Sequence, residues 1–589
     1  MVDLKSKPYN LSDEDIEWVK STIKNMSDEE KVGQLFFQLT ASDEEGYLKE
    51  LVEKYHIGGC RYNPMSAEKL VRQNAILQKY AKIPLFIACN PEKGGDGICT
   101  DGTAVGSAIK VGATGNPNYA KAMGYVSGDE MAQVGCNMAF APVVDILYNH
   151  QCEEVLNRSF GNDPGLVAKM GLAYMEGIHQ SEGMASVAKH FPGNGQDSRD
   201  AHISNNINSF GLEKWMQTYA EVYKRLIDAG LDGIMGGHIL MPSLMRDLRP
   251  EITYEELLPA TLTKEIMTTL LRDILKFNGM VVTDASHMVA MTSKMKRSEM
   301  LPLAINAGCD MFLFFNDPDE DFNTMLEAYR GGIISEDRMR EALTRILGLK
   351  AKMGLHKAKK ADSKTKNDNM TTIIDNNRHK SYFRDISRDS ITLVKNLDSG
   401  IFPLSPAKTK RITIVEIKGV DSPLRAFAKM VMGSVDEKKT PAEKLKERLE
   451  HQGFDVSIYE SPIEKMKEMI KRGEKPSLNL YFAGKNAISD FVDQQDLVIS
   501  LFDVSIGRPS FGISKGGGEV PWYVHELPVI GISLGKPTIL ADCPQLRTYI
   551  NAYDSADETM DALVDALITG NFHGKDPIDS FCGMWEARI

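Results

Sequence analysis

The sequence of 589 residues lacks any run of about 18 consecutive apolar residues, the length that an α-helix needs to cross a bilayer. Its first residues, MVDLKSKPYNLSDEDIEWVK, also lack the apolar core that follows the positive charges of a secretory signal peptide. We therefore expect no membrane span and no membrane partner, and we expect the protein to be cytoplasmic.

Cysteine is present but is not arranged as a metal or disulfide framework. None of the eight cysteines belongs to a CxxC pair, and no His/Cys cluster has the spacing of zinc ligands. Several lie inside apolar runs, as in LFIAC, which ends at Cys89. The pattern predicts buried, reduced thiols.

The chain also lacks a long block of basic residues. It holds 69 Lys and Arg against 81 Asp and Glu, for a formal net charge of -12. Because affinity for nucleic acid comes largely from clustered Lys and Arg that neutralise phosphates, this balance argues against nucleic acid as a partner.

What the sequence does contain, up to residue 355, is a series of short apolar runs that alternate with stretches of helical spacing such as 212–229. This alternation is typical of repeated βα units. Eight strands close a (β/α)8 barrel, so we predict a catalytic barrel over residues 1–355, with an open doubly wound sheet as the alternative. The runs are VGQLFFQ from Val32, GGCRYN from Gly58, IPLFIACN from Ile83, NMAFAP from Asn137, ASVAKH from Ala185, DGIMGGH from Asp232, GMVVTD from Gly279 and DMFLFFN from Asp310.

Residues 356–380 interrupt this pattern with HKAKKADSKTKNDNMTTIIDNNRHK, which is basic and almost without apolar periodicity, so we predict a solvated linker. A second α/β pattern fills residues 381–589 and predicts a separate sheet with helices on its faces. Its strand-like runs are RITIVEI at Arg411, FDVSIY at Phe454, DLVISLF at Asp496, LPVIGISL at Leu527 and PTILA at Pro537.

Polar residues stand at the ends of the predicted barrel strands. The carboxyl ends of parallel barrel strands converge on one mouth, where barrel active sites are built, so we expect these residues to form a site. They are Asn63, Asn90, Lys189, His190, His238, Asp284 and Asn316.

The densest polar segment, KHFPGNGQDSRDAH over residues 189–202, follows the fifth run. Its glycines and proline predict a loop that folds over the barrel mouth. Asp200 and His202 share a face of extended backbone, so the carboxylate can orient the imidazole and raise its pKa, which suits a general acid. The alternative is an ordinary hydrogen bond to a surface histidine.

Asp284 ends an apolar strand, where a carboxylate is costly to bury unless other groups meet it. With Lys189, His190 and Arg158 nearby it would stay ionised and serve as a nucleophile. The alternative is a structural ion pair with one of these bases.

A metal site is a further alternative. No HxH follows the first strand, and a lysine beside His190 would repel a cation, both of which argue against it. Its ligands would be His190, His202, His238, Asp284 and His287.

The segment KHFPGNG from Lys189, followed by Asp200-Ala-His202, resembles the KHFPGHG…DSH motif of family 3 glycoside hydrolases of the bacterial β-N-acetylglucosaminidase type. Other segments agree in the same order, and the second half resembles the family's accessory α/β/α sandwich, so the similarity covers nearly the whole chain. The segments are FAPVVD ending at Asp145, RSFGNDP from Arg158, PATLT from Pro259, VTD ending at Asp284 and NAGCD from Asn306.

The resemblance implies a catalytic role for three residues. Asp284 would attack the anomeric carbon, and His202, paired with Asp200, would protonate the leaving oxygen and later activate water. Such double displacement retains the anomeric configuration and needs no cofactor or metal.

The resemblance also implies a set of substrate-binding residues. Asn90 stands where the family has an Asp, and no Arg follows it at the expected place, so the sugar preference is open at this position. The set comprises Arg158, Lys189, His190, Asn90 and Met288.

We therefore predict an exo-acting retaining glycoside hydrolase that releases terminal β-linked N-acetylglucosamine from a small glycan or cell-wall-derived saccharide. A β-glucosidase-like hydrolase and a glycoside phosphorylase are the alternatives on the same site. A glycan-binding protein without turnover is the alternative of another class, and the retained Asp284 and Asp200/His202 pair argue against it.

Overall fold

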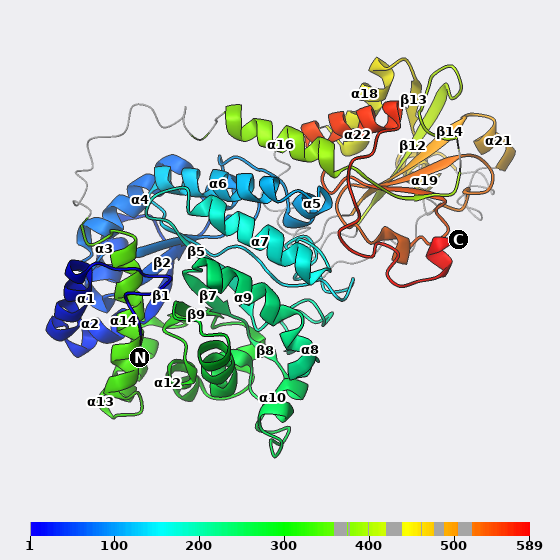
Figure 1. The fold of residues 1–589 in the computed structure, drawn as a ribbon. Coiled ribbons are helices and arrows are strands. Elements are labelled where there is room, and N and C mark those ends of the chain that lie inside the picture. The colour runs from blue at the N-terminus through cyan, green and yellow to red at the C-terminus, as the bar shows by residue number, and fades with distance from the viewer. Residues whose placement is uncertain are drawn as a thin grey trace. The chain divides into compact units, whose positions relative to one another are not determined.

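The structure, a computed structural model, describes residues 2–357, 374, 377–398, 400–419, 439–460, 462–475, 488–504 and 521–589. The chain divides into two compact units, Met1–Ala108 with Asn116–Tyr382, and Ile109–Gly115 with Phe383–Ile589 (Figure 1). Most of the predicted linker, 356–380, lies outside the described residues.

The first unit is built on a closed barrel of parallel strands, which confirms the predicted fold (Figure 1). Each of the apolar runs supplies one strand, and the order around the barrel is β1-β10-β9-β7-β5-β4-β3-β2. The strands are β1 (Phe36–Thr40), β2 (Gly59–Tyr62), β3 (Phe86–Cys89), β4 (Met138–Ala139), β5 (Ala185–Phe191), β7 (Gly233–Gly236), β9 (Met280–Ala285) and β10 (Met311–Leu313).

Helices between the strands cover the outside of the barrel (Figure 1). The stretch 212–229 forms two helices instead of one, because Thr218 has φ -126° and ψ -89° and its hydroxyl bonds the carbonyl oxygen of Lys214 at 2.8 Å. The helices are α1 (Asp13–Asn25), α2 (Asp28–Gly33), α3 (Glu45–Tyr55), α4 (Ala67–Tyr80), α6 (Pro117–Val134), α7 (Pro164–Ile178), α8 (Leu212–Met216), α9 (Tyr219–Ala229), α10 (Pro242–Leu248), the π-helix η3 (Glu265–Ile274), α11 (Val289–Thr292), α12 (Arg297–Ala307), α13 (Pro318–Arg330) and α14 (Glu336–Lys352).

Aromatic side chains fill the barrel below its mouth. The rings of Phe37 and Phe86 are stacked with centroids 6.2 Å apart, and the ring of Phe140 lies 5.3 Å from that of Phe37. All three are fully or almost fully buried. The barrel interior is therefore a packed core, and polar side chains above this layer face the mouth.

The second unit contains a six-stranded sheet of order β11-β16-β15-β14-β12-β13, in which only β11 is antiparallel to its neighbour. The run PTILA does not form a strand, because Pro537 lacks an N–H for a sheet ladder and Ile539–Ala541 make a short 3-10 helix, η4. The strands are β11 (Thr392–Asn396), β12 (Arg411–Lys418), β13 (Asp455–Ile458), β14 (Leu497–Asp503), β15 (Val529–Ser533) and β16 (Thr548–Asn551).

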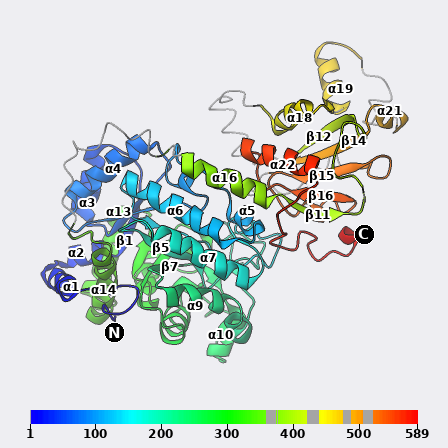
Figure 2. The same cartoon turned by 45° about the horizontal axis from the view of Figure 1, so that its top comes forward.

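This sheet has an apolar core on each face, as an α/β/α sandwich requires. On one face α18 (Pro441–His451) and α22 (Asp557–Thr569) pack side by side on the strands (Figure 2). The other face packs against α21 (Ile488–Val492), η4 and the segment around Tyr523. Also in this part of the chain are α5 (Ala108–Ala113), α19 (Pro462–Lys471), and α16 (Asn377–Ser390), which begins in the first unit.

The eight cysteines are all unpaired, and all but Cys582 are buried, which confirms the predicted thiols. Among the described helices, none combines the length and the apolar character needed to cross a membrane.

Candidate active site

Strand β5 and the loop that follows it carry much of the predicted site. All seven residues of β5 are buried, including the polar residues Ser186, Lys189 and His190. The chain then turns through Gly193 and Gly195, whose φ angles are 122° and 112°. A Cβ there would lie 2.1 Å from the ring of Tyr219 or 2.0 Å from the carbonyl oxygen of Ile146, respectively. Glycine at both positions lets the loop fold back against the barrel.

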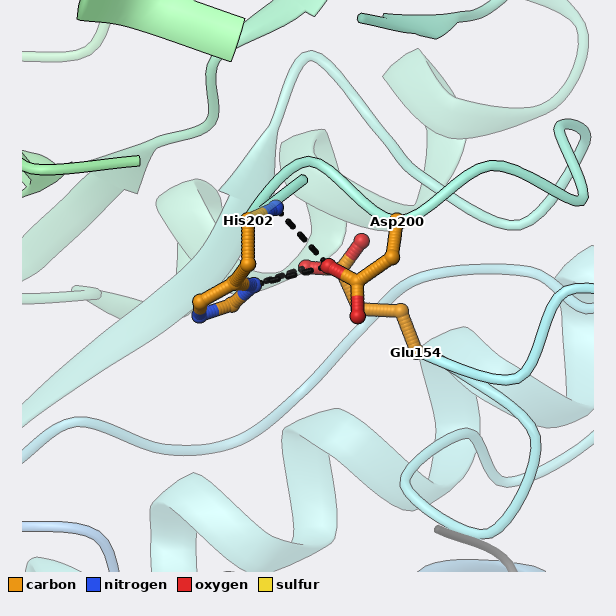
Figure 3. Close-up of side chains that lie close together, drawn as sticks. All are labelled: Glu154, Asp200 and His202. Atoms are coloured by element: carbon orange, nitrogen blue, oxygen red, sulfur yellow. Dashed lines mark hydrogen bonds and ion pairs between the residues drawn. The ribbon is translucent and has the colours of Figure 1, made fainter. Parts of the chain in front are cut away.

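His202 and Asp200 form a hydrogen-bonded pair at the end of this loop (Figure 3). Nδ1 of His202 lies 2.8 Å from Oδ1 of Asp200, and the same oxygen accepts the backbone N–H of His202 at 2.8 Å. These contacts fix the ring and hold its Nδ1 proton on the Asp200 side. Nε2 points away from the carboxylates, and 33% of the side chain is exposed. The pair thus leaves Nε2 available for proton exchange.

Glu154 lies beside this pair (Figure 3). One of its oxygens is 3.7 Å from Nδ1 of His202, and the other accepts from Nδ2 of Asn194 at 3.2 Å and from the N–H of Ala201 at 3.3 Å. Burial raises the pKa of Glu154, and the charge of Asp200 also raises it. Glu154 therefore joins the start and the end of the loop beneath the imidazole.

Asp284 lies at the mouth end of β9. Its Oδ1 accepts the N–H of Ala285 at 2.7 Å, and its Oδ2 lies 3.9 Å from Nε2 of His190. Burial raises the pKa of Asp284, but the charges of His190 and Lys189 and the N–H of Ala285 outweigh burial and lower it to about 2. The side chain is 16% exposed, so an ionised carboxylate reaches the mouth.

His190 is oriented by Asp145, which is fully buried at the end of the FAPVVD segment. Oδ2 of Asp145 lies 2.7 Å from Nδ1 of His190, and its Oδ1 accepts the N–H groups of His190 at 3.1 Å and of Asn194 at 2.8 Å. This arrangement directs Nε2 of His190 toward Asp284 and toward Nη2 of Arg158, which is 3.5 Å away.

Arg158 and Lys189 are held together by Glu92. The guanidinium binds both Glu92 oxygens, at 2.7 and 2.9 Å, and Nζ of Lys189 lies 2.7 Å from Oε1. Burial raises the pKa of Glu92, but the two cations hold it well below its ordinary value. Burial lowers the pKa of Lys189, and Glu92 opposes that shift. One ionised carboxylate thus fixes two of the predicted sugar-binding cations.

The loop that carries His202 rests on the segment after Asp284. The N–H of Val289 donates to the carbonyl oxygen of His202 at 3.4 Å. Met288, the residue before α11, is buried, and its carbonyl oxygen accepts hydrogen bonds from the N–H groups of Met291 and Thr292. The structure therefore brings the predicted proton donor, the predicted nucleophile and Met288 to one side of the mouth.

Asn90 follows β3, and its buried side-chain oxygen, unlike the polar groups described above, makes no hydrogen bond to the described residues. Asn194, which replaces the second histidine of the motif, is in contrast only 3% exposed. Its Nδ2 donates to Glu154, and its Oδ1 accepts from the N–H of Gly195 and from Nδ2 of Asn206.

Three residues of this site were not predicted from the sequence: Glu92, Asp145 and Glu154. Glu92 stands two residues after Asn90, and Asp145 ends a strand segment, so a search for carboxylates after strands would have found both. Glu154 has no such signal, because it lies in a loop and acquires its neighbours only through folding.

The five ligands considered for the alternative metal site, all among the described residues, do not converge on one point. Within the described residues, the group whose ligand atoms converge is Glu154, Asp200 and His202, which shares only His202 with the set considered above. His238 instead contacts Oγ1 of Thr261 at 2.8 Å and the carbonyl oxygen of Ala285 at 3.1 Å.

Comparison with known proteins identifies the family of the chain. Residues 27–349 match the glycosyl hydrolase family 3 N-terminal domain. The chain is 35% identical to the beta-N-acetylglucosaminidase/beta-glucosidase of Cellulomonas fimi, over 100% of both chains. It is also 34% identical to a solved structure named beta-glucoside phosphorylase BglX, with a TM-score of 0.87 over 99% of each chain.

A further solved structure is a family 3 beta-N-acetylglucosaminidase from Paenibacillus sp. str. FPU-7, which is 24% identical with a TM-score of 0.72, over 94% of this chain and 99% of that one. At this identity it supports the fold. The family match and the full-length similarity show that this chain belongs to glycosyl hydrolase family 3 and is a glycoside hydrolase.

Proposed function

We propose that the protein is an exo-acting retaining β-glycosidase that removes a terminal β-linked N-acetylglucosamine or glucose residue through a covalent bond to Asp284. The observation that carries this proposal is the contrast at the mouth between two groups. Asp284 is ionised and reaches the mouth, whereas the Asp200/His202 pair presents a ring nitrogen that can carry a proton. This pairing of a nucleophile with an acid/base group is what double displacement requires.

In the first step, a carboxylate oxygen of Asp284 bonds to the anomeric carbon while the bond from that carbon to the glycosidic oxygen breaks. The leaving oxygen takes the proton from Nε2 of His202. Asp200 stabilises the imidazolium before this transfer and keeps Nδ1 protonated afterwards, so the neutral ring has its free nitrogen toward the substrate.

In the second step, water attacks the anomeric carbon and the bond to Asp284 breaks. Nε2 of His202 takes a proton from the attacking water and returns to its starting state. Two inversions at the same carbon yield net retention.

The sugar preference is supported by two features. Arg158 and Lys189 are fixed by Glu92 as hydrogen-bond donors at the mouth, which suits sugar hydroxyl groups. The relatives that are 34–35% identical over the whole chain carry names that refer to β-glucosides and to β-N-acetylglucosaminides. A screen of 4-nitrophenyl β-glycosides that differ in the sugar and its 2-substituent tests which one is accepted.

The replacement Asp284→Ala tests the nucleophile. We expect kcat/KM to fall by at least about a thousandfold, because covalent catalysis is lost, with little change in Tm. Azide should restore release of 4-nitrophenol and give the α-glycosyl azide. Asp273→Ala, which removes an exposed carboxylate, is the control. Activity of Asp284→Ala within about tenfold of wild type would show that the assignment is wrong.

Phosphate is a second candidate for the acceptor. A carboxylate acid/base would repel an anionic acceptor, whereas the imidazole of His202 does not, and a full-length relative is named a phosphorylase. In this reaction a phosphate oxygen attacks the anomeric carbon, the bond to Asp284 breaks, and Nε2 of His202 recovers its proton from the phosphate hydroxyl. Turnover with and without phosphate separates the two reactions: accumulation of a sugar 1-phosphate indicates phosphorolysis, and free sugar alone indicates hydrolysis.

A further inference from the structure

Arg61 on β2 is an arginine inside the barrel that none of the interactions above involves. In the sheet register it pairs with Leu39 of β1 and with Ala88 of β3. The preceding inward position on β2 is Gly59, where a Cβ would lie 2.6 Å from the ring of Phe37. Because inward and outward residues alternate along a strand, Arg61 projects from the layer directly above the aromatic floor.

The guanidinium of Arg61 has no hydrogen bond or ion pair with any residue that the structure describes. Its Nε is fully buried without a partner. Nη1 and Nη2 are not among the fully buried atoms that lack a partner, so these two nitrogens keep some exposed surface. The side chain as a whole is only partly exposed.

The neighbouring carboxylates form neither a hydrogen bond nor an ion pair with Arg61. Glu92 and Asp284 lie close enough to act electrostatically on it, although burial is the larger effect and lowers the pKa of Arg61. Both oxygens of Glu92 are already bound by Arg158, and one of them also by Lys189. The mouth therefore contains more donors than its carboxylates use.

A partly buried arginine without a partner is costly, because the guanidinium loses hydration and gains no hydrogen bond. A ligand that occupies the mouth can remove this cost. The planar guanidinium presents its donors side by side, a geometry that matches two oxygens on adjacent atoms. Vicinal hydroxyl groups of a sugar ring offer such a pair, and Asn90, two residues after Ala88, offers further unused hydrogen-bonding capacity beside it.

We propose that Arg61 is a substrate-binding residue, whose guanidinium donates to adjacent hydroxyl groups of the terminal sugar and so selects for their presence. This inference rests on the proposed function, since it places the terminal sugar in the same mouth.

The experiment measures binding instead of turnover. In the Asp284→Asn background, calorimetry gives Kd for 4-nitrophenyl β-D-glucoside, for the N-acetyl-β-D-glucosaminide, and for the 3-, 4- and 6-deoxy analogues of the tighter ligand. Adding Arg61→Met should weaken the parent glycoside by about 10- to 100-fold, as expected for hydrogen bonds to a charged group. The same replacement should barely change Kd for the analogues that lack the hydroxyl groups bound by Arg61.

Two further variants make the result specific. Arg61→Lys, which keeps the charge but not the paired donors, should recover only part of the affinity. Arg330→Met, which removes an exposed arginine paired with Glu29, should leave every Kd unchanged. The inference is wrong if Arg61→Met weakens binding of the parent and of all deoxy analogues by the same factor, or if it does not weaken binding of the parent. It is also wrong if neither parent glycoside binds. Selective binding by a chain that shows no turnover before Asp284 is replaced would contradict the proposed function and leave the role of Arg61 intact.

Discussion

At the scale of single residues, the surroundings of the carboxylates in the site shift their pKa values in opposite directions. Asp284 has cations and an N–H group near it, and its pKa is lowered to about 2. Glu154 is more deeply buried than Asp284 and has another carboxylate beside it, and its pKa is raised. The same side-chain chemistry thus gives an ionised group at the mouth and a structural group beneath the loop.

The Asp200/His202 pair leads to a prediction about leaving groups. His202→Ala removes the proton donor, so kcat/KM should fall by about 100-fold or more for alkyl β-glycosides, whose leaving oxygen needs the proton. It should fall by less than about tenfold for 4-nitrophenyl β-glycosides, because nitrophenolate leaves without protonation. Kinetics on both substrates check this, with His287→Ala, which removes an exposed imidazole, as the comparison. Equal losses on both substrates would count against His202 as the acid.

At the scale of elements, the strand pattern was predictable and the exceptions have local causes. Continuous apolar runs predict buried parallel strands, and all eight barrel strands were found where expected. The prediction of a strand over PTILA was wrong, because apolar composition does not distinguish a strand from a buried turn. The division between α8 and α9 lies at Thr218, whose backbone angles are not helical, and periodicity does not register such a local change.

Asp232 connects several of these elements at the start of β7. It accepts the N–H of Ser186 on β5 at 2.9 Å, contacts Nε2 of His179 after α7 at 2.6 Å, and binds Lys352 on α14. Burial raises the pKa of Asp232, but Lys352 and His179 outweigh it and lower it to about 2.

This shift predicts acid-sensitive stability. Because the folded-state pKa is below the unfolded value, the contribution of Asp232 is present above about pH 4 and is lost as the pH falls toward 2. The shift corresponds to roughly 2 kcal/mol. Asp232→Asn should therefore lower the Tm of the barrel at pH 7, and calorimetry should show the difference from wild type shrinking between pH 5 and pH 3. A difference independent of pH would refute this account.

At the scale of the whole molecule, we predict how the enzyme responds to metal ions from the side chains that could bind one. Glu154, Asp200 and His202 lie close enough to bind an ion, but Nδ1 of His202 carries the proton that Asp200 accepts. A metal would have to displace that proton. We expect EDTA to leave kcat/KM unchanged and Zn²⁺ to inhibit more strongly as the pH rises. Loss of activity in EDTA that Zn²⁺ restores would show instead a metal-dependent enzyme.

Sequence alone determined the order of the barrel strands, and with it the group of residues that meets at the mouth, because strand ends follow from local apolar runs. Asp284, Lys189 and His190 could be predicted in this way, and Asp200 and His202 from the loop segment that follows the fifth run. Only the tertiary structure decided the partners: Glu92 between two cations, Glu154 beneath the loop, and Arg61 with no hydrogen-bond or ion-pair partner among the residues that the structure describes. It also placed residues 109–115 in the second unit, where buried Lys110 contacts Asp554 at 2.7 Å. Such contacts join residues that are far apart in the chain, and their energies depend on distance and burial, which no local pattern records.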